Sequence, residues 1–177
     1  MALLAEEIVQ EWLNRQGYFT IRGIKLGVHE IDLLAIRPTA QGNLECRHLE
    51  VQASMRPISY ITRLPVAVQK ATGRAPNSAK TRADDELLLG VREWIAKKFD
   101  HDVKVQLRDE LAPGPWSREL VVHKVRHATE LSIIEQQGIK VHQLARVVGE
   151  LKGGQLMVEG AAGMHLSELV ALAAESE

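Results

Sequence analysis

The pattern of apolar and polar residues divides the first third of the chain into one helix and three strands. Apolar residues recur every three or four positions over residues 2–16, which predicts an amphipathic helix that ends at Gly17. Residues 18–26, 30–36 and 44–53 are rich in apolar and β-branched residues or alternate with period two, which predicts strands. We therefore expect the order helix, strand, strand, strand.

The middle of the chain predicts further helices and strands. Residues 65–72 suit a short helix, and residues 83–99 suit a longer one with an acidic first turn and a basic last turn, as the helix dipole favours. Gly90 interrupts the longer helix, which indicates either close packing or weak helix propensity at that point. Residues 102–107 and 119–125 show the apolar alternation or apolar run of strands.

Two interpretations remain open near the end of this region. Residues 128–137 predict a helix. After it, residues 139–144 form a strand and residues 145–152 a short helix, or residues 129–152 together form a helix–turn–helix. The β-branched residues after the first helix favour the strand, which would extend the sheet.

Length and composition indicate one α/β domain with a short extension. The chain has 177 residues, of which 45% are hydrophobic and 25% charged, as in ordinary soluble globular proteins. We assign residues 1–152 to the domain and residues 153–177 to a Gly- and Ala-rich extension with a short helix at 165–174. That helix either docks on the domain or pairs with another chain, for example in a homodimer. The net charge of −1 excludes a global basic signature of nucleic-acid binding.

Cysteine usage and the N-terminal residues indicate the compartment. The single cysteine, Cys46, excludes an internal disulfide and a cysteine zinc cluster. Two glutamates in the first ten residues and the lack of a long apolar run argue against a signal peptide or a membrane span. We expect a cytoplasmic protein without membrane contact.

Acidic residues lie on the two central predicted strands. Alternation puts Glu50 and Gln52 on one face of their strand, roughly 6.6–6.8 Å apart. If the strands pair, Asp32 lies about 4.8 Å from Glu50 across the ladder. Two carboxylates at that distance suit a hard cation such as Mg²⁺; alternatively, they belong to a solvated sheet edge. His29 and His48 flank these acids, so they either support the carboxylates or are ordinary surface histidines, and we favour the second interpretation.

Two glutamates near the start of the predicted helix 2–16 lie on different faces. Glu6 shares a face with Val9 and Leu13, whereas Glu7 lies on the polar face. Because a carboxylate at the edge of a buried stripe needs a partner, Glu6 is the candidate for an acid directed toward the strands. Alternatively, Glu6 is a charge near the helix N-terminus that the dipole stabilises.

The order of the strand acids resembles the PD-(D/E)XK nuclease superfamily, which has the restriction-endonuclease-like fold. Asp32, followed by Glu50-Val51-Gln52, is similar to the family's acid on one strand and acid-x-Lys on the next. The similarity covers residues 3–60, about a third of the chain. It implies an α/β fold with a restriction-endonuclease-like core, in the order α-β-β-β-α-β with a central mixed sheet flanked by helices, and a helical C-terminal extension.

The resemblance also implies a function and roles for the site residues. The expected activity is divalent-metal-dependent hydrolysis of DNA phosphodiester bonds, with Mg²⁺ or Mn²⁺ as the cofactor. Asp32, Glu50 and the Val51 carbonyl would hold the metal, together with Glu6, which resembles the glutamate of the family's first helix. Gln52 would orient the attacking water.

The sequence departs from the family pattern at two positions. Ile31 replaces the nominal proline, and Gln52 replaces the lysine that helps to orient or activate water and to stabilise charge. A neutral glutamine can only form hydrogen bonds. The enzyme is then slow, recruits Lys25 or Arg56 as the missing cation, or has lost its activity. Lys25 is otherwise an ordinary cation at a strand end, which we favour. If activity has been lost, the chain is a nucleic-acid- or protein-binding module, or a structural subunit held by its C-terminal helix.

One segment, residues 62–82, is locally basic and contains no acidic residue. It predicts either contacts with phosphate groups or a solvated loop. Two polar residues directly after the second acidic strand suit phosphate contacts as well. The candidate nucleic-acid-binding residues are Ser54, Arg56, Arg63, Lys70, Arg74, Lys80 and Arg82.

Overall fold

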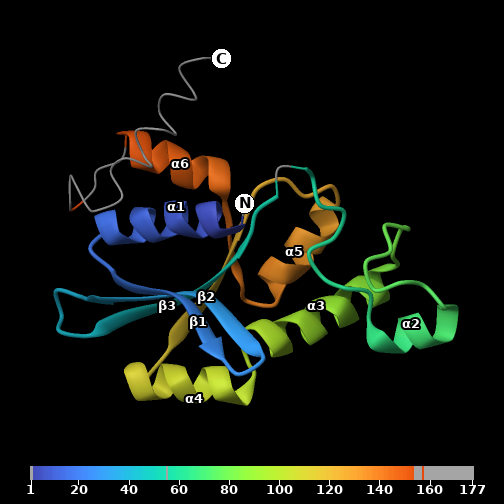
Figure 1. Cartoon of the computed structure of the whole chain (residues 1–177), viewed down its shortest axis with the longest axis horizontal. Helices are drawn as coiled ribbons and strands as arrows, with labels where there is room; N and C mark the ends of the chain where they lie inside the picture. The colour runs from blue at the N-terminus through green and yellow to red at the C-terminus, as the bar shows by residue number, and fades with distance from the viewer. Residues whose placement is uncertain (1, 55, 154–156, 158–177) are drawn as a thin grey trace.

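A mixed sheet of five strands in the order β1-β2-β3-β4-β5 forms the middle layer of the protein. The computed structural model describes residues 2–54, 56–153 and 157 (Figure 1). The strands are β1 (Phe19–Leu26), β2 (His29–Pro38), β3 (Leu44–Gln52), β4 (Trp116–Val122) and β5 (Lys140–Gln143). The helices are α1 (Ala2–Arg15), α2 (Val66–Thr72), α3 (Asp84–Lys98), α4 (Asp102–Leu111), α5 (Ala128–Gln136) and α6 (Leu144–Gly153).

Strand direction changes in the middle of the sheet. β1, β2 and β3 form an antiparallel meander, whereas β3, β4 and β5 run parallel. The β2–β3 ladder includes the pair Leu33–Leu49, and the β3–β4 ladder includes the pair Gln52–Val122. The start of β2 therefore lies beside the carboxyl ends of β3 and β4, at one edge of the sheet.

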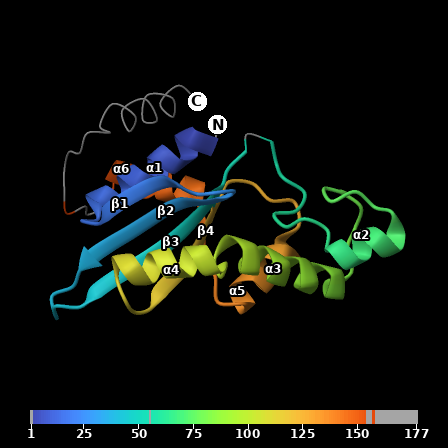
Figure 2. The same ribbon diagram turned by 60° about the horizontal axis from the view of Figure 1, so that its bottom comes forward.

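Helices cover both faces of the sheet. α1 and α6 lie on one face, and α3, α4 and α5 lie on the other (Figures 1 and 2). Each face has its own apolar core, because alternate residues of every strand point to opposite faces. The core beneath α1 and α6 includes Val9, Leu13, Leu33, Leu49 and Val51. The core on the other face includes Trp94, Phe99, Leu120, Val122 and Ile134.

Most predicted elements are confirmed. The opening order of helix and three strands holds, and the mixed sheet flanked by helices is the expected α/β architecture. The strand–helix interpretation of residues 139–152 is confirmed, because β5 pairs in parallel with β4 and α6 follows it. The helix–turn–helix interpretation is therefore wrong. Among the described residues, no helix is both long enough and apolar enough to cross a membrane.

One predicted strand is a helix. Residues 102–107 begin α4, whose inner side carries Lys104 and Arg108, four residues apart and both buried. Residues four apart share a face of a helix, so this conformation directs both cations toward the sheet. The predicted helix at 165–174 lies outside the described residues, and the homodimer that it suggested stays a prediction.

Gly90 permits a close contact between α3 and the segment after β3. A Cβ atom at this position would lie 3.1 Å from the carbonyl oxygen of Arg63 and 3.1 Å from Oγ1 of Thr62. Thr62 cannot retreat easily, because its Oγ1 also donates a hydrogen bond of 2.6 Å to Glu130. Of the two explanations for this glycine, close packing is therefore confirmed.

We expect Gly90→Ala to lower the free energy of unfolding by about 1–2 kcal/mol, although alanine is the better helix former by about 1 kcal/mol. Gly149→Ala in α6 is the matched control, because a Cβ there meets nothing within 4 Å. The control should gain about 0.5–1 kcal/mol. Urea denaturation of both variants checks the prediction, and a comparable gain for Gly90→Ala would contradict it.

Candidate functional site

β2 and β3 bring Asp32 and Glu50 to the same face of the sheet, as the sequence predicted. The β2–β3 register pairs Leu33 with Leu49, so its continuation by one position places Asp32 opposite Glu50. Asp32 Oδ2 accepts a hydrogen bond of 2.8 Å from the Val51 amide. This side-chain contact fixes the aspartate where the two strands separate.

The protein environment disfavours a second negative charge beside Glu50. Burial and the neighbouring Glu50 carboxylate raise the pKa of Asp32 to about 6, against an ordinary value of 3.8. Lys98 and the Val51 amide act in the opposite direction but only in part. A cation bound next to both carboxylates would relieve this repulsion.

Glu50 is fully buried and is surrounded by side chains that the sequence did not reveal. Its Oε2 accepts a hydrogen bond of 2.5 Å from Lys98 Nζ. Its Oε1 lies 3.3 Å from both Lys104 Nζ and His48 Nε2. Lys98 ends α3 and Lys104 lies in α4, so two helices deliver ammonium groups to one strand carboxylate.

His48 is fully buried, so its interpretation as a surface histidine is wrong. Its Nδ1 lies 3.2 Å from Arg108 Nη1. A guanidinium can only donate, so Nδ1 is the acceptor and the ring proton sits on Nε2, which faces Glu50. Burial and the Arg108 charge hold the pKa of His48 well below its ordinary value, so the ring is a neutral donor. His29, by contrast, is half-buried, and its ring centre lies 3.8 Å from that of His101.

The two lysines around Glu50 differ in their electrostatic balance. Burial lowers the pKa of Lys98, but the carboxylates of Glu50 and Asp32 outweigh it and the net pKa lies above the ordinary value. Burial lowers the pKa of Lys104, and Glu50 compensates only in part. Lys98 is therefore a firmly protonated cation at the site, whereas Lys104 is a buried support for Glu50.

Glu6 and Glu7 have different neighbours, as their spacing on the helix predicted. Glu7 forms an ion pair of 3.1 Å with Arg22 on β1. Glu6 is half-buried, and burial and the Asp32 carboxylate raise its pKa. Glu6 therefore belongs to the electrostatic environment of Asp32. Within the described residues, however, no three or more His, Cys, Asp or Glu side chains are grouped closely enough to hold a metal ion.

Neither Gln52, at the motif position, nor Lys25, a candidate replacement for the motif lysine, supplies an ammonium group to Glu50. Gln52 ends β3, is half-buried and lines a cleft together with Lys98. Lys25 is exposed on the edge strand β1, opposite Glu30 in the register. Among the described side chains, the lysines that contact Glu50 are Lys98 and Lys104, and Lys25 is not one of them.

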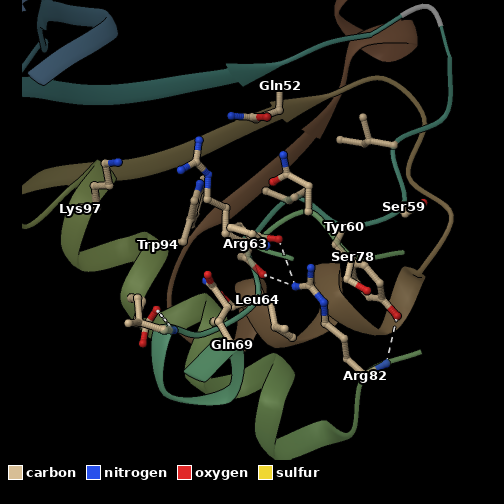
Figure 3. A pocket seen from close by; sticks show the side chains of 18 of the residues that line it. Gln52, Ser59, Tyr60, Arg63, Leu64, Gln69, Ser78, Arg82, Trp94 and Lys97 are labelled. Carbon is tan, nitrogen blue, oxygen red and sulfur yellow. Dashed lines mark hydrogen bonds between the residues drawn. The ribbon is translucent and has the colours of Figure 1, made fainter. Parts of the chain in front are cut away.

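A cleft of about 800 Å³ begins beside Gln52 and Lys98 and extends between α3 and the segment 58–64 (Figure 3). Two of the predicted nucleic-acid-binding residues, Arg63 and Arg82, line it. Arg74 does not; it forms a 3.0 Å ion pair with Glu86. The other candidates are also outside the lining: Ser54 is half-buried, and Arg56, Lys70 and Lys80 are exposed.

Asp32 and Glu50 carry the type of donor atom that a hard divalent cation prefers, although both oxygens of Glu50 already contact lysine ammonium groups. Both side chains offer carboxylate oxygens, and Mg²⁺ often binds one or two carboxylates while it keeps several waters. In a strand, the N–H and C=O of one residue point to the same side. The Val51 carbonyl is thus directed to the side of Asp32, where its amide already forms a hydrogen bond.

The raised pKa of Asp32 makes a prediction about stability. An acid whose pKa is raised on folding stabilises the native state below its unfolded pKa of 3.8 and loses that contribution as the pH rises through about 6. Asp32→Asn removes this penalty but keeps an oxygen that accepts the Val51 hydrogen bond. We expect the variant to gain about 1–3 kcal/mol in unfolding free energy at pH 7 and nothing below pH ~4.

Urea denaturation of Asp32→Asn at pH 4 and pH 7 measures this gain. Asp109→Asn on the exposed side of α4 serves as the control and should change stability by less than about 0.5 kcal/mol. A loss of stability for Asp32→Asn at pH 7 would show that the carboxylate is not under electrostatic strain.

No protein-family model and no curated protein matches the chain. Among solved structures, the crystal structure of a protein of unknown function, AF1548, is similar, with a TM-score of 0.45 and 11% sequence identity. The match covers 82% of this chain and 59% of that chain, so the chain spans less than two thirds of the length of that structure.

Proposed function

We propose that the protein is a divalent-metal-dependent nuclease of the PD-(D/E)XK type, with DNA as the expected substrate. The observation that carries this proposal is the meeting of two carboxylates and a protonated lysine at one sheet edge: Asp32, Glu50 and Lys98. The order α1-β1-β2-β3 and the mixed sheet are compatible with a restriction-endonuclease-like core.

Asp32, Glu50 and the Val51 carbonyl would hold Mg²⁺ or Mn²⁺, and Glu6 would add negative charge nearby. When bound, such a metal polarises the phosphate and lowers the pKa of a coordinated water. Lys104 and His48 hold the Glu50 carboxylate in a fixed orientation, because each lies 3.3 Å from its Oε1.

Lys98 would supply the charge that the motif lysine supplies in related nucleases. It reaches Glu50 from α3, whereas the motif position on β3 holds Gln52. A protonated ammonium next to the scissile phosphate donates hydrogen bonds to phosphate oxygens and stabilises the negative charge that develops there. The neutral amide of Gln52 would orient the attacking water.

One observation favours a second candidate function, a catalytically degenerate module that binds nucleic acid or protein. Both oxygens of Glu50 already contact lysine ammonium groups, Lys98 on Oε2 and Lys104 on Oε1. Lysines in these positions balance the carboxylate charge without a metal. Such a module would bind its partner equally well in a chelator and would not cleave.

The two functions are separated by a cleavage assay on supercoiled, linear duplex, single-stranded and branched DNA, in Mg²⁺, Mn²⁺ or chelator. We expect metal-dependent cleavage by the wild type and by the control Asp109→Asn, and a loss of roughly 10²-fold or more for Asp32→Asn. Equal cleavage by Asp32→Asn would place the activity elsewhere. The degenerate module is the conclusion if the wild type binds DNA but cleaves none of the substrates.

A further inference from the structure

We infer that the cleft beside the site is a binding site for a single, unpaired nucleic-acid strand. This inference rests on the proposed function and names the form of its substrate. The cleft is about 800 Å³ in volume, within the range of sites that enclose one small ligand, roughly 300–1,000 Å³. A space of this size holds a nucleotide or two of one strand. In a duplex the bases are paired with the other strand and would remain outside the cleft.

The cleft is continuous with the candidate catalytic residues. Gln52 and Lys98 are part of its lining, and Lys98 also contacts Glu50. Figure 3 shows Gln52 and Lys97 at one end and Arg82 at the other. A strand whose phosphate lies at Lys98 would therefore place its neighbouring nucleotide in the cleft.

The residues that line the cleft carry a net positive charge, although the chain as a whole does not. Four basic residues line the cleft, against one acidic residue, Glu93, whereas the whole chain has a net charge of −1. The basic residues are Arg63, Arg82, Lys97 and Lys98. Arg63 and Lys97 are exposed and have no ion-pair partner among the described residues, so their charges are available to phosphate groups.

The walls of the cleft are held in place before any ligand arrives. The buried carboxylate of Glu130 accepts hydrogen bonds from the amides of Ile61 and Thr62 at 2.6 and 3.0 Å. Arg82 donates a hydrogen bond of 3.0 Å to the Thr62 carbonyl, and its guanidinium lies 3.9 Å from the centre of the Tyr60 ring. A preformed cleft lowers the entropy cost of ordering a strand.

The cleft offers charge and hydrogen bonds, and its two aromatic lining residues are already packed against other rings. Tyr60 is stacked on His127 with ring centres 4.3 Å apart, and it also contacts Arg82. Trp94 is buried and packs edge-on against Phe99, with ring centres 5.5 Å apart. Base stacking on aromatic rings is what gives many single-strand-binding proteins their affinity and base preferences. We therefore expect strong salt dependence and little sequence preference here.

The test is fluorescence anisotropy with one labelled oligonucleotide sequence as single-stranded DNA, single-stranded RNA and duplex DNA, in chelator so that cleavage is absent. We expect the wild type to bind single strands roughly 10-fold or more tightly than the duplex. Arg63→Ala with Lys97→Ala should weaken single-strand binding on the order of 10-fold. Each substitution should reduce the slope of log K against log salt by about 0.7.

The matched control is Arg92→Ala with Lys140→Ala, which removes two exposed cations from α3 and β5 that do not line the cleft. It should change binding by less than about twofold. Equal or tighter binding of the duplex, or an equal loss in the control, would overturn the inference. Binding is measured without metal, so the two proposals can fail separately. If the protein binds single strands but cleaves no substrate, the proposed nuclease function is wrong and the inferred single-strand binding site stands.

Discussion

Lys98→Ala is expected to lower the rate of metal-dependent cleavage by roughly 10²–10³-fold, the usual cost of removing one group that stabilises negative charge as it develops in the reaction. The reason is that Lys98 is the protonated cation that contacts Glu50 where the sequence motif has only Gln52. The rate is measured at saturating DNA so that weaker binding does not enter. Arg92→Ala, which removes an exposed cation from the same helix, should leave the rate within about twofold.

A second substitution tests whether Lys98 acts through its charge at this place. Gln52→Lys in the Lys98→Ala background returns an ammonium to the motif position on β3, and we expect it to restore part of the lost rate. A purely structural role for Lys98 would lower the stability, and the new lysine would not restore cleavage. Cleavage by Lys98→Ala at the wild-type rate would contradict the assignment directly.

Glu119→Gln is expected to lower the unfolding free energy by about 3–5 kcal/mol, because it leaves a buried guanidinium without its counter-charge. Arg47 on β3 donates two hydrogen bonds to Glu119 on β4, at 2.9 and 2.5 Å. Ser117 and His142 also contact this carboxylate, at 2.6 and 2.7 Å. The network ties β3, β4 and β5 together beneath α1, on the face opposite the candidate site.

The same pair predicts how stability depends on pH. Although burial acts in the opposite direction, hydrogen bonds from His142 and Arg47 lower the pKa of Glu119 to about 2, from an ordinary 4.5. A lowered acid pKa stabilises the fold above pH ~4.5, and that stabilisation is lost as the pH falls toward 2, by about 3 kcal/mol. Glu119→Gln should therefore lose this part of the acid sensitivity.

Urea denaturation of the wild type and Glu119→Gln between pH 2 and pH 7 measures both effects. Glu45→Gln is the control, because its 2.6 Å ion pair with Arg37 is partly exposed and should contribute at most about 1 kcal/mol. Equal losses for the two variants at pH 7 would mean that the buried pair contributes no more than a surface pair.

Local patterns in the sequence were sufficient for the first three strands and for the acids on them. Side chains alternate with period two along a strand and recur with period 3.6 along a helix, so the direction of Glu50 or Glu6 depends on a few neighbouring residues. For this reason the pairing of Asp32 with Glu50 and the inward position of Glu6 relative to Glu7 could be predicted.

The cations of the site could not be predicted in the same way. Lys98 is separated from Glu50 by 48 residues and Lys104 by 54, and Arg108 is 60 residues from His48. In the sequence, Lys98 fits the ordinary preference of cations for a helix C-terminus, and the alternation around Lys104 suggests a strand. No local sequence pattern distinguishes a lysine whose ammonium group contacts a buried carboxylate from a lysine that is exposed to solvent.

The fold class and the two carboxylates thus follow from local periodicity, which acts over a few residues. The identity of the cation at the site, the burial of His48 and the cleft between α3 and the segment 58–64 arise only when distant segments pack together. These features depend on which side chains become buried together and which opposite charges come into contact in the folded protein. An unpaired buried charge costs several kcal/mol, so the folded chain places Lys104 against Glu50 even though its local sequence pattern favours a strand.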